Sequence, residues 1–146
     1  SFAGSGGNDF IQGASGDDQI SGDSSADVLV GGRGVDIMTG GGDGDFFRFI
    51  LITDTDVDEG NRDEIADFSS ADGDILDLSR IDANANVAGN NAFTFVNAFA
   101  NTAGQATIET AGPNLFLVSM DVNGDSVADG EIQVSAIAFD AGDLLL

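Results

Sequence analysis

The N-terminal part of the chain repeats with a period of nine residues. Five blocks follow one another without insertion between residues 4 and 48: GSGGNDFIQ, GASGDDQIS, GDSSADVLV, GGRGVDIMT and GGGDGDFFR. An aspartate occupies the sixth place of every block, and an apolar residue follows two places later. A fixed short period is typical of repeat architectures, in which each block packs against its neighbours because it cannot bury its apolar side chains alone.

Each block reads as a tight turn followed by a very short strand. Glycines gather at the first, second and fourth places of the blocks, where they allow a positive φ without a Cβ clash. Two blocks would form one coil, and every second block would then lie about 4.8 Å above its predecessor. The inward Ile, Leu, Met and Phe side chains would form two facing ladders. The repeat therefore predicts a parallel β-roll, a β-solenoid of nonapeptides, over residues 1–48.

Stacking of the coils would bring the repeat aspartates into register. Asp9, Asp27 and Asp45 would form one column, and Asp18 and Asp36 the other. Carboxylates about 5 Å apart repel one another by about 1 kcal/mol in water, and by more where they are partly desolvated. A cation held between them would remove this repulsion. The available ligands are oxygens, and the chain has neither His nor Cys, so the pattern favours Ca²⁺ over Mg²⁺, zinc or copper.

Pairing of alternate blocks predicts about three Ca²⁺ ions in the roll. Asp27 would then serve two ions, whereas Asp45, in the last block, would serve one. Two blocks depart from the pattern, because Ser25 and Asp43 stand at the fourth place, and Gly44 follows Asp43. Besides the five repeat aspartates, the predicted ligands are Gly7, Gly16, Gly32, Gly34, Gly41 and Asp43. A glycine-rich solenoid without bound ions is the alternative.

The chain changes character after residue 48. Glycines thin out, and segments with alternating apolar residues are separated by turn sequences such as SSADGD, AGPN and DVNGDS. We expect strands within residues 47–52, 63–68, 73–81, 93–99, 105–110, 115–122 and 131–139. This spacing predicts a second all-β part over residues 49–146, an antiparallel β-sandwich-like sheet that continues from the roll and covers its open end.

Two resemblances add to these expectations. The nonapeptide resembles the repeat of RTX calcium-binding proteins, and DEIADFSSADGDILDLSRIDAN, FTFVNAFANTAGQATIE, DVNGDSVADGEIQV and FDAGDLLL resemble, in that order, the C-terminal domain of serralysin-type (peptidase M10) metalloproteases. The resemblance implies a right-handed calcium β-roll followed by a β-sandwich, in a secreted, extracellular protein. It also implies a C-terminal signal read by a type I exporter. Similar domains occur on lipases, polysaccharide-modifying enzymes and adhesins, so we expect a piece of a longer protein whose upstream domain is not identified.

The residues Asp143–Leu146 fit the acidic and apolar ending of such a signal. Terminal leucines that pack on a sheet explain the same residues, and both roles are compatible. In the loop ITDTDVDEGNRD, the resemblance implies that Asp54 and Asp63 are ligands of the last roll ion. Because this loop is long, Asp56 or Asp58 could take that role, and plain solvated charge is a further explanation.

A second acidic cluster lies between two predicted strands. Its residues follow the spacing D-x-N-x-D-x-x-x-D, which can wrap a cation that prefers oxygen ligands: Asp121, Asn123, Asp125 and Asp129. The cluster is not an EF-hand, because Ser126 and Ile132 stand where that loop has Gly and Glu. A hairpin loop without an ion explains the spacing as well.

Composition excludes several classes of function. A formal net charge of −22 repels nucleic acid and anionic membranes, and no apolar run is long enough to insert into a membrane. The absence of His excludes the H-E-x-x-H metalloprotease motif and His-dependent triads. No disulfide can form without Cys. We therefore expect a monomeric, non-catalytic chain.

These observations predict the calcium-binding C-terminal module of a secreted bacterial protease or other hydrolase. Inside the cell, where Ca²⁺ is scarce, repulsion along the aspartate columns would keep the repeats loose enough for export. Outside, Ca²⁺ would fold them. The alternative is a calcium-stiffened adhesion or ligand-binding module, for which TFVNAFANT (residues 94–102) is the candidate surface.

Overall fold

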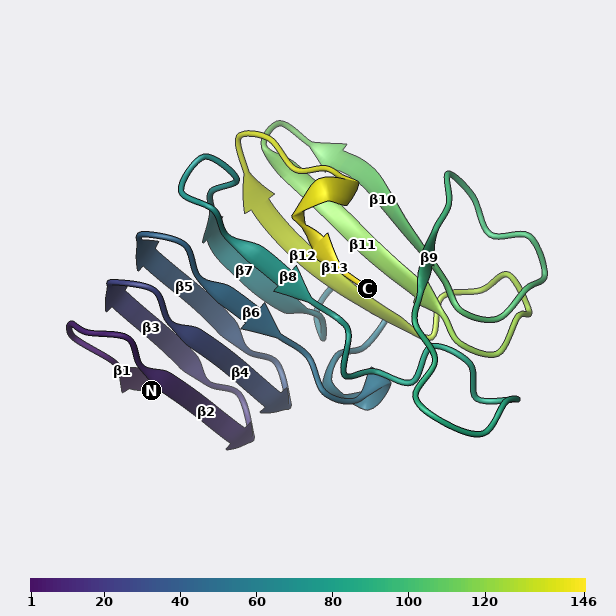
Figure 1. The fold of residues 1–146 in the computed structure, drawn as a ribbon, viewed down its shortest axis with the longest axis horizontal. Helices are drawn as coiled ribbons and strands as arrows, with labels where there is room; N and C mark the ends of the chain where they lie inside the picture. The colour runs from purple at the N-terminus through teal and green to yellow at the C-terminus, as the bar shows by residue number, and fades with distance from the viewer.

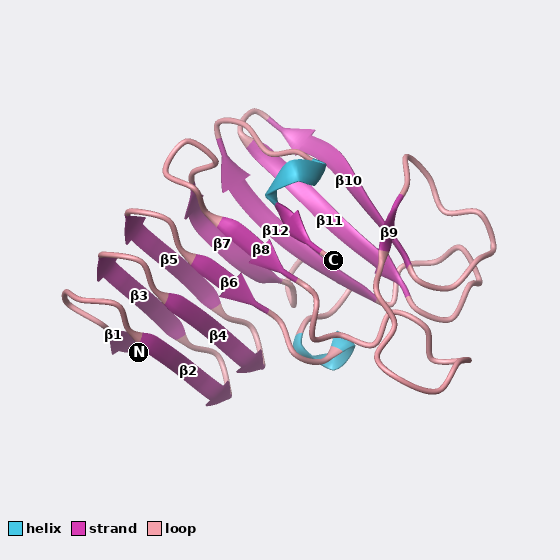
Figure 2. Cartoon of the chain, viewed as in Figure 1, coloured by secondary structure: helices cyan, strands magenta, loops and turns pink.

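A computed structural model describes all residues, 1–146, as two facing β-sheets (Figures 1 and 2). The larger sheet has the order β1 (Phe2–Ala3), β3 (Gln19–Ser24), β5 (Ile37–Gly42), β7 (Asp63–Phe68), β12 (Gly130–Ala136), β11 (Leu115–Asp121), β10 (Gln105–Gly112), β9 (Thr94–Phe95). The smaller sheet has the order β13 (Leu144–Leu145), β8 (Ile75–Asp77), β6 (Phe46–Arg48), β4 (Val28–Arg33), β2 (Phe10–Ser15). Two single-turn 3₁₀ helices, η1 (Ile52–Asp54) and η2 (Ala141–Asp143), complete the fold. The predicted all-β class is confirmed. The structure contains no helix that could span a membrane.

The repeat blocks form a parallel roll with the predicted register. Ile11 on β2 lies beside Leu29 on β4, and Ile20 on β3 lies beside Met38 on β5. These side chains belong to two inward ladders, Phe2, Ile20, Met38, Ile65 and Val134 on the larger sheet and Ile11, Leu29, Phe47, Leu76 and Leu144 on the smaller one. The D-x-apolar spacing places an aspartate in each turn because the apolar residue two positions later must face inward.

Both sheets continue past residue 48. β5 pairs in parallel with β7 and β6 with β8, so β7 and β8 form a fourth coil after the segment 49–62. One cluster of 20 buried apolar residues runs through both parts, from Leu29 through Ile65 to Val118. The predicted division at residue 48 thus does not coincide with a break in either sheet or in the core. Whether residues 1–48 and 49–146 act as separate domains stays a prediction.

The C-terminal part is only partly antiparallel. β10, β11 and β12 pair antiparallel as expected. β12, however, is parallel to β7, and β13 is parallel to β8. The last residues of the chain therefore add a fifth coil, because Val134 and Leu144 extend the two inward ladders. β11, β10 and β9 then prolong the larger sheet beyond this coil (Figure 1).

Candidate cation sites between the coils

The first aspartate column lies in the turns that lead from the larger sheet to the smaller one. The main-chain N–H of Asp9 donates to Oδ1 of Asp27 at 2.7 Å, and the N–H of Asp27 donates to Oδ1 of Asp45 at 2.8 Å. The column continues beyond the repeats, because the N–H of Asp45 donates to Oδ1 of Asp74 at 2.8 Å. The carboxylates of Asp27, Asp45 and Asp74 are thereby each fixed against the preceding coil.

The second column lies in the turns on the opposite side. The N–H of Asp18 donates to Oδ1 of Asp36 at 2.9 Å, and the N–H of Asp36 donates to Oδ1 of Asp63 at 2.8 Å. The two columns together contain five intervals between consecutive aspartates. Three of these intervals join the aspartates paired from the sequence, and two use Asp63 and Asp74.

The second oxygen of most of these carboxylates is buried without a hydrogen-bond partner. The unpaired atoms are Oδ2 of Asp9, Asp27, Asp36, Asp45 and Asp63. Buried polar atoms in folded proteins are nearly always paired, and an unpaired buried carboxylate oxygen lowers stability. Their repetition at one position of the repeat makes these oxygens candidate cation ligands.

In four of the five blocks, the first glycine leaves room beside an unpaired oxygen. A Cβ placed on Gly22 would collide with Oδ2 of Asp27 and would lie 2.6 Å from the carbonyl oxygen of Gly40. A Cβ on Gly4 would lie 2.7 Å from Oδ2 of Asp9 and 2.8 Å from the carbonyl oxygen of Gly22. A carboxylate and a carbonyl oxygen thus border the same small space, which is a donor set that suits Ca²⁺.

The prediction that first-place glycines need a positive φ is wrong, since none of them lies in that region. The second and fourth places do require it, and they include the predicted glycine ligands Gly7, Gly16, Gly32, Gly34 and Gly41. Asp43 also has a positive φ, of 71°, at an exposed turn position. A Cβ on Gly34 would lie 2.5 Å from the carbonyl oxygen of Gly16, so these turns stack closely. The role of these residues as ligands stays a prediction.

The buried carboxylates are poorly compensated by the protein itself. Burial raises the pKa of Asp63 to about 8; the N–H of Asp36 opposes this rise, and the carboxylates of Asp36 and Asp54 add to it. Burial likewise raises the pKa of Asp45 to about 6, with the Asp27 and Asp74 carboxylates adding to the rise. The pKa values of Asp36 and Asp74 are also raised, first by burial. Near neutral pH the Asp63 carboxyl therefore favours a proton or a cation.

The segment 49–62 contributes Asp54 to the last interval of the second column. Asp54 is buried, and its Oδ2 accepts the N–H of Leu51 at 2.8 Å. A cavity of about 250 Å³ beside it is lined by Gly34, Val35, Thr53, Asp54, Thr55, Asp56 and Asn61. Of the two alternatives, Asp56 lines the same cavity and Asp58 is exposed.

The sequence analysis did not predict Asp74 as a ligand, although the residues around it carry the pattern of a repeat aspartate. The stretch SADGDIL (70–76) has the same D-G-D-x-apolar pattern as GGDGDFF (41–47), but the nine-residue count is lost in between. Because Asp74 follows Asp45 in the column, Asp45 lies between two aspartates, as Asp27 does. The structure therefore does not support the prediction that Asp27 serves two ions and Asp45 only one. Asp67 lies over Gly40 and accepts the N–H groups of Gly40 and Gly41, both at 2.9 Å.

The loop 121–129 differs from the columns. Backbone N–H groups of the loop donate to side-chain oxygens of all four predicted ligands, Asp121, Asn123, Asp125 and Asp129. Asp121 is fully buried, and its two oxygens accept the N–H groups of Gly124 at 2.6 Å and Ser126 at 2.9 Å. No buried oxygen of this loop is unpaired. This geometry favours the hairpin loop without an ion, and ion binding here stays an untested prediction.

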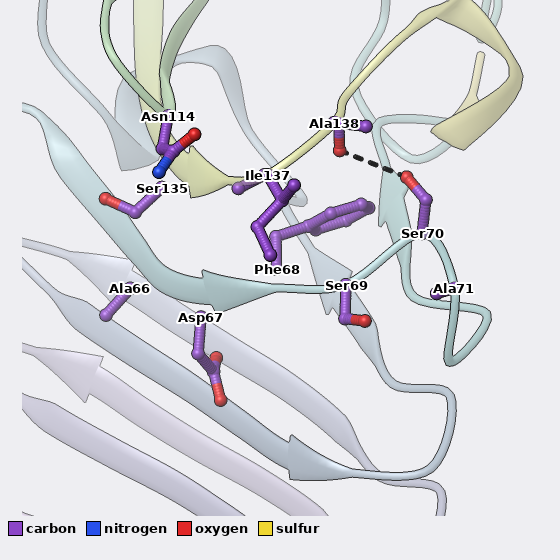
Figure 3. A pocket seen from close by; sticks show the side chains of 11 residues that line it. Ala66, Asp67, Phe68, Ser69, Ser70, Ala71, Asn114, Ser135, Ile137 and Ala138 are labelled. Atoms are coloured by element: carbon purple, nitrogen blue, oxygen red, sulfur yellow. Dashed lines mark hydrogen bonds between the residues drawn. The ribbon is translucent and has the colours of Figure 1, made fainter.

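An apolar cavity of about 470 Å³ lies apart from the columns, between the turn after β7 and the end of β12 (Figure 3). Phe68 and Ile137 contribute its apolar wall. The one acidic side chain that lines it is Asp67, whose oxygens are bound to Gly40 and Gly41. The structure gathers no group of three or more acidic side chains able to hold a metal by themselves. An ion between the coils would therefore need carbonyl or water oxygens as well.

Comparison with known proteins finds a matching family and similar solved structures. A sequence model of the family described as peptidase M10 serralysin C terminal matches residues 4–146. The solution structure of the AlgE6R3 subunit from the Azotobacter vinelandii mannuronan C5-epimerase is similar, with a TM-score of 0.53 and 21% identity, over 94% of this chain and 77% of that chain. At this identity the likeness shows a common fold. Among curated proteins no significant match is found.

Proposed function

Because this chain belongs to the peptidase M10 serralysin C-terminal family, we propose that it is a non-catalytic module of a secreted protein that folds when Ca²⁺ enters the intervals between its coils. The observation that carries the proposal is the row of buried, unpaired Oδ2 atoms at one position of the repeat. The match is to a C-terminal domain family and not to a peptidase domain. Catalysis is accordingly assigned to another part of the parent protein.

The proposed ligands are the facing aspartates of each interval. In the first column these are Asp9, Asp27, Asp45 and Asp74, and in the second column they are Asp18, Asp36 and Asp63, with Asp54 beside the last interval. Carbonyl oxygens such as that of Gly40, which borders the space beside Gly22, would complete the coordination. Bound Ca²⁺ would supply positive charge between the carboxylates and link successive coils.

The energy available from binding is of the size that folding requires. Extracellular calcium modules bind with dissociation constants of about 10⁻⁴–10⁻³ M, and a tenfold excess of ligand stabilises the folded state by about 1.4 kcal/mol per site. Three to five such sites together give about 4–7 kcal/mol, which is comparable with the net stability of a small domain. Scarce cytosolic Ca²⁺ would leave the columns repulsive, and abundant extracellular Ca²⁺ would fold the chain.

The first test is a calcium titration of the full chain followed by circular dichroism. We expect a marginally stable chain with reduced β-structure in chelator and a cooperative gain as Ca²⁺ rises toward millimolar, with a much weaker response to Mg²⁺. Asp27→Asn should raise the calcium midpoint about threefold to tenfold, because it removes one charged ligand from two intervals. Glu109→Gln, at an exposed position of β10 away from every predicted ligand, should leave it unchanged. Identical spectra with chelator and with calcium would refute the proposal.

The proposal includes export through the C-terminus. Asp143–Leu146 combine an acidic residue with three leucines, which fits the ending that a type I exporter reads. The adhesion alternative has weaker support, because Phe93 is buried and Phe95 and Phe99 are half-buried. The stretch around residues 94–102 therefore lacks the exposed aromatic surface that such binding would use.

A further inference from the structure

The segment 49–62 is fastened to β12, a strand far away in the sequence. The hydroxyl of Thr55 donates to the carbonyl oxygen of Glu131 at 2.5 Å, and the N–H of Glu131 donates to the carbonyl oxygen of Asp56 at 3.2 Å. A Cβ on Gly130 would lie 2.9 Å from Cδ1 of Ile52. The neighbouring glycine therefore permits the close approach that places Thr55 on the strand.

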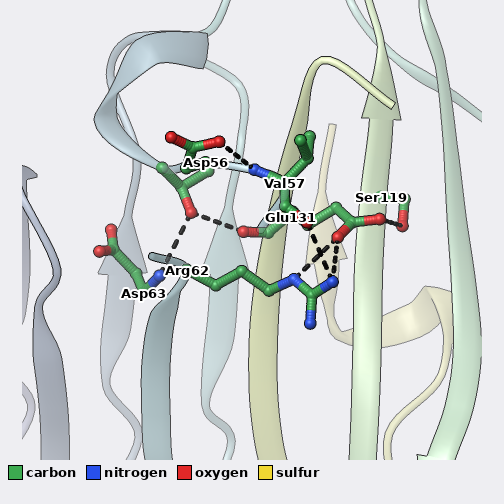
Figure 4. A network of polar contacts seen from close by, with 7 residues as sticks. Asp56, Val57, Arg62, Asp63, Ser119 and Glu131 are labelled. Carbon is green, nitrogen blue, oxygen red and sulfur yellow. Dashed lines mark hydrogen bonds and ion pairs between the residues drawn. The ribbon is translucent and has the colours of Figure 1, made fainter. Parts of the chain in front are cut away.

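The side chain of Glu131 holds the same segment a second time (Figure 4). Nε of Arg62 lies 2.7 Å from Oε2 of Glu131, and the hydroxyl of Ser119 donates to Oε1 at 3.2 Å. Both members of the ion pair are largely shielded, with 18% of the Arg62 side chain and 14% of the Glu131 side chain exposed. Arg62 is one of only four cationic side chains in a chain with 26 acidic ones, so its placement against a single carboxylate is a specific feature of this fold.

These contacts continue the second aspartate column. The N–H of Asp36 donates to Oδ1 of Asp63, and the N–H of Asp63 lies 3.3 Å from Oγ1 of Thr55. The hydroxyl of Thr55 in turn reaches β12 at Glu131. A chain of hydrogen bonds thus runs from the last interval of the column into the strand that begins the fifth coil. The buried Asp54, directly before Thr55, lies close enough to Asp63 for their charges to repel.

We propose that Thr55 and Arg62, acting through Glu131, are positioning residues that couple the cation interval at Asp36 and Asp63 to the docking of β12. The inference rests on the proposed calcium function and concerns residues that would not touch the ion. With neither a cation nor a proton on Asp63, repulsion between Asp54 and Asp63 displaces η1, and Thr55 moves away from β12. With a cation, η1 is held against the column, and Thr55 and Arg62 hold the fifth coil.

Hydrogen exchange of the full chain across a calcium titration tests this coupling. The readout is the calcium concentration that half-protects the amides of residues 130–136, divided by the concentration that half-protects those of residues 28–42. Thr55→Val keeps the shape of the side chain but removes its hydroxyl, and it should raise this ratio about threefold to tenfold. Arg62→Met should change the ratio in the same direction. Proportional movement of both midpoints, or no movement, would overturn the proposal.

Two further variants separate coupling from a general loss of stability. Ser135→Ala removes another hydroxyl of β12, whose Oγ lies 3.4 Å from Oε1 of Glu64 on β7, and it should leave the ratio unchanged. In an Asp63→Asn background, Thr55→Val should have no further effect on the ratio, because the cation interval is already impaired. A wild-type chain without any calcium-dependent protection would refute the proposed function and this inference together. Calcium-dependent protection with an unaltered ratio in Thr55→Val would refute the inference alone.

Discussion

At the first glycine of each block, a side chain is excluded by oxygen atoms and not by a backbone torsion. Gly22 has no positive φ, yet a Cβ there would enter the space between Asp27 and Gly40. Gly42 is a matched counterpart, because it also has no positive φ and a Cβ there would have no atom within 4 Å. The two positions therefore separate the need for space at the candidate site from the general flexibility of glycine.

We expect Gly22→Ala to destabilise the calcium-loaded chain by about 1–3 kcal/mol, since a methyl group must displace the next coil. It should also raise the calcium midpoint for folding. Gly42→Ala should change stability by no more than about 0.5 kcal/mol. Urea unfolding at saturating calcium and in chelator measures both effects. Equal losses in the two variants would show that the space beside Asp27 has no special role.

At the scale of strands and coils, the sequence predicted what the nine-residue period controls. It placed Asp9, Asp27 and Asp45 in one column, because aspartate and inward residue recur together. The count is lost across the segment 49–62. The next aspartate of the second column, Asp63, follows 27 positions after Asp36 and was indicated only by the family resemblance, and that of the first column, Asp74, follows 29 positions after Asp45 and was missed. Local spacing carries no information about such offsets, which depend on how the loop packs against β12.

Local sequence patterns also did not predict that β12 pairs in parallel with β7 and β13 in parallel with β8. The alternation in residues 131–139 indicates a strand but does not choose its partner, and the antiparallel neighbour β11 is the one closest in sequence. β12 joins β7 because Val134 extends the ladder above Ile65. Leu144 does the same on the smaller sheet above Leu76. Partner choice thus follows from the long-range core, which only the assembled coils create.

The last strand allows packing and export to be distinguished. Leu144 is half-buried and contacts the core, whereas 45% of Leu145 is exposed. Leu144→Ser should destabilise the folded chain by about 1–2 kcal/mol, and Leu145→Ser by no more than about 0.5 kcal/mol. If a type I exporter reads the terminal leucines, both variants should reduce secretion of the full-length protein. Normal secretion of Leu145→Ser beside impaired Leu144→Ser would instead assign these leucines to packing.

At the scale of the whole molecule, the charge of −22 makes stability depend on what neutralises the columns. In the folded chain the pKa of Asp63 is raised from 3.8 to about 8 and that of Asp45 to about 6, in both cases first by burial. A group with a raised pKa in the folded state binds its proton more tightly there than in the unfolded state. Its stabilising contribution is complete below about pH 4 and is lost as pH rises through the folded-state value.

In chelator we therefore expect the melting temperature to fall as pH rises from 5 to 8, by about 3–8 °C. Saturating calcium should reduce this fall, because the cation then takes the place of the protons. The calcium midpoint should accordingly rise as pH is lowered, since protons and Ca²⁺ compete for the same oxygens. Thermal melts across this pH range measure the effect, and Asp63→Asn should flatten its upper part. A melting temperature that rises with pH in chelator would contradict the picture of buried, uncompensated carboxylates.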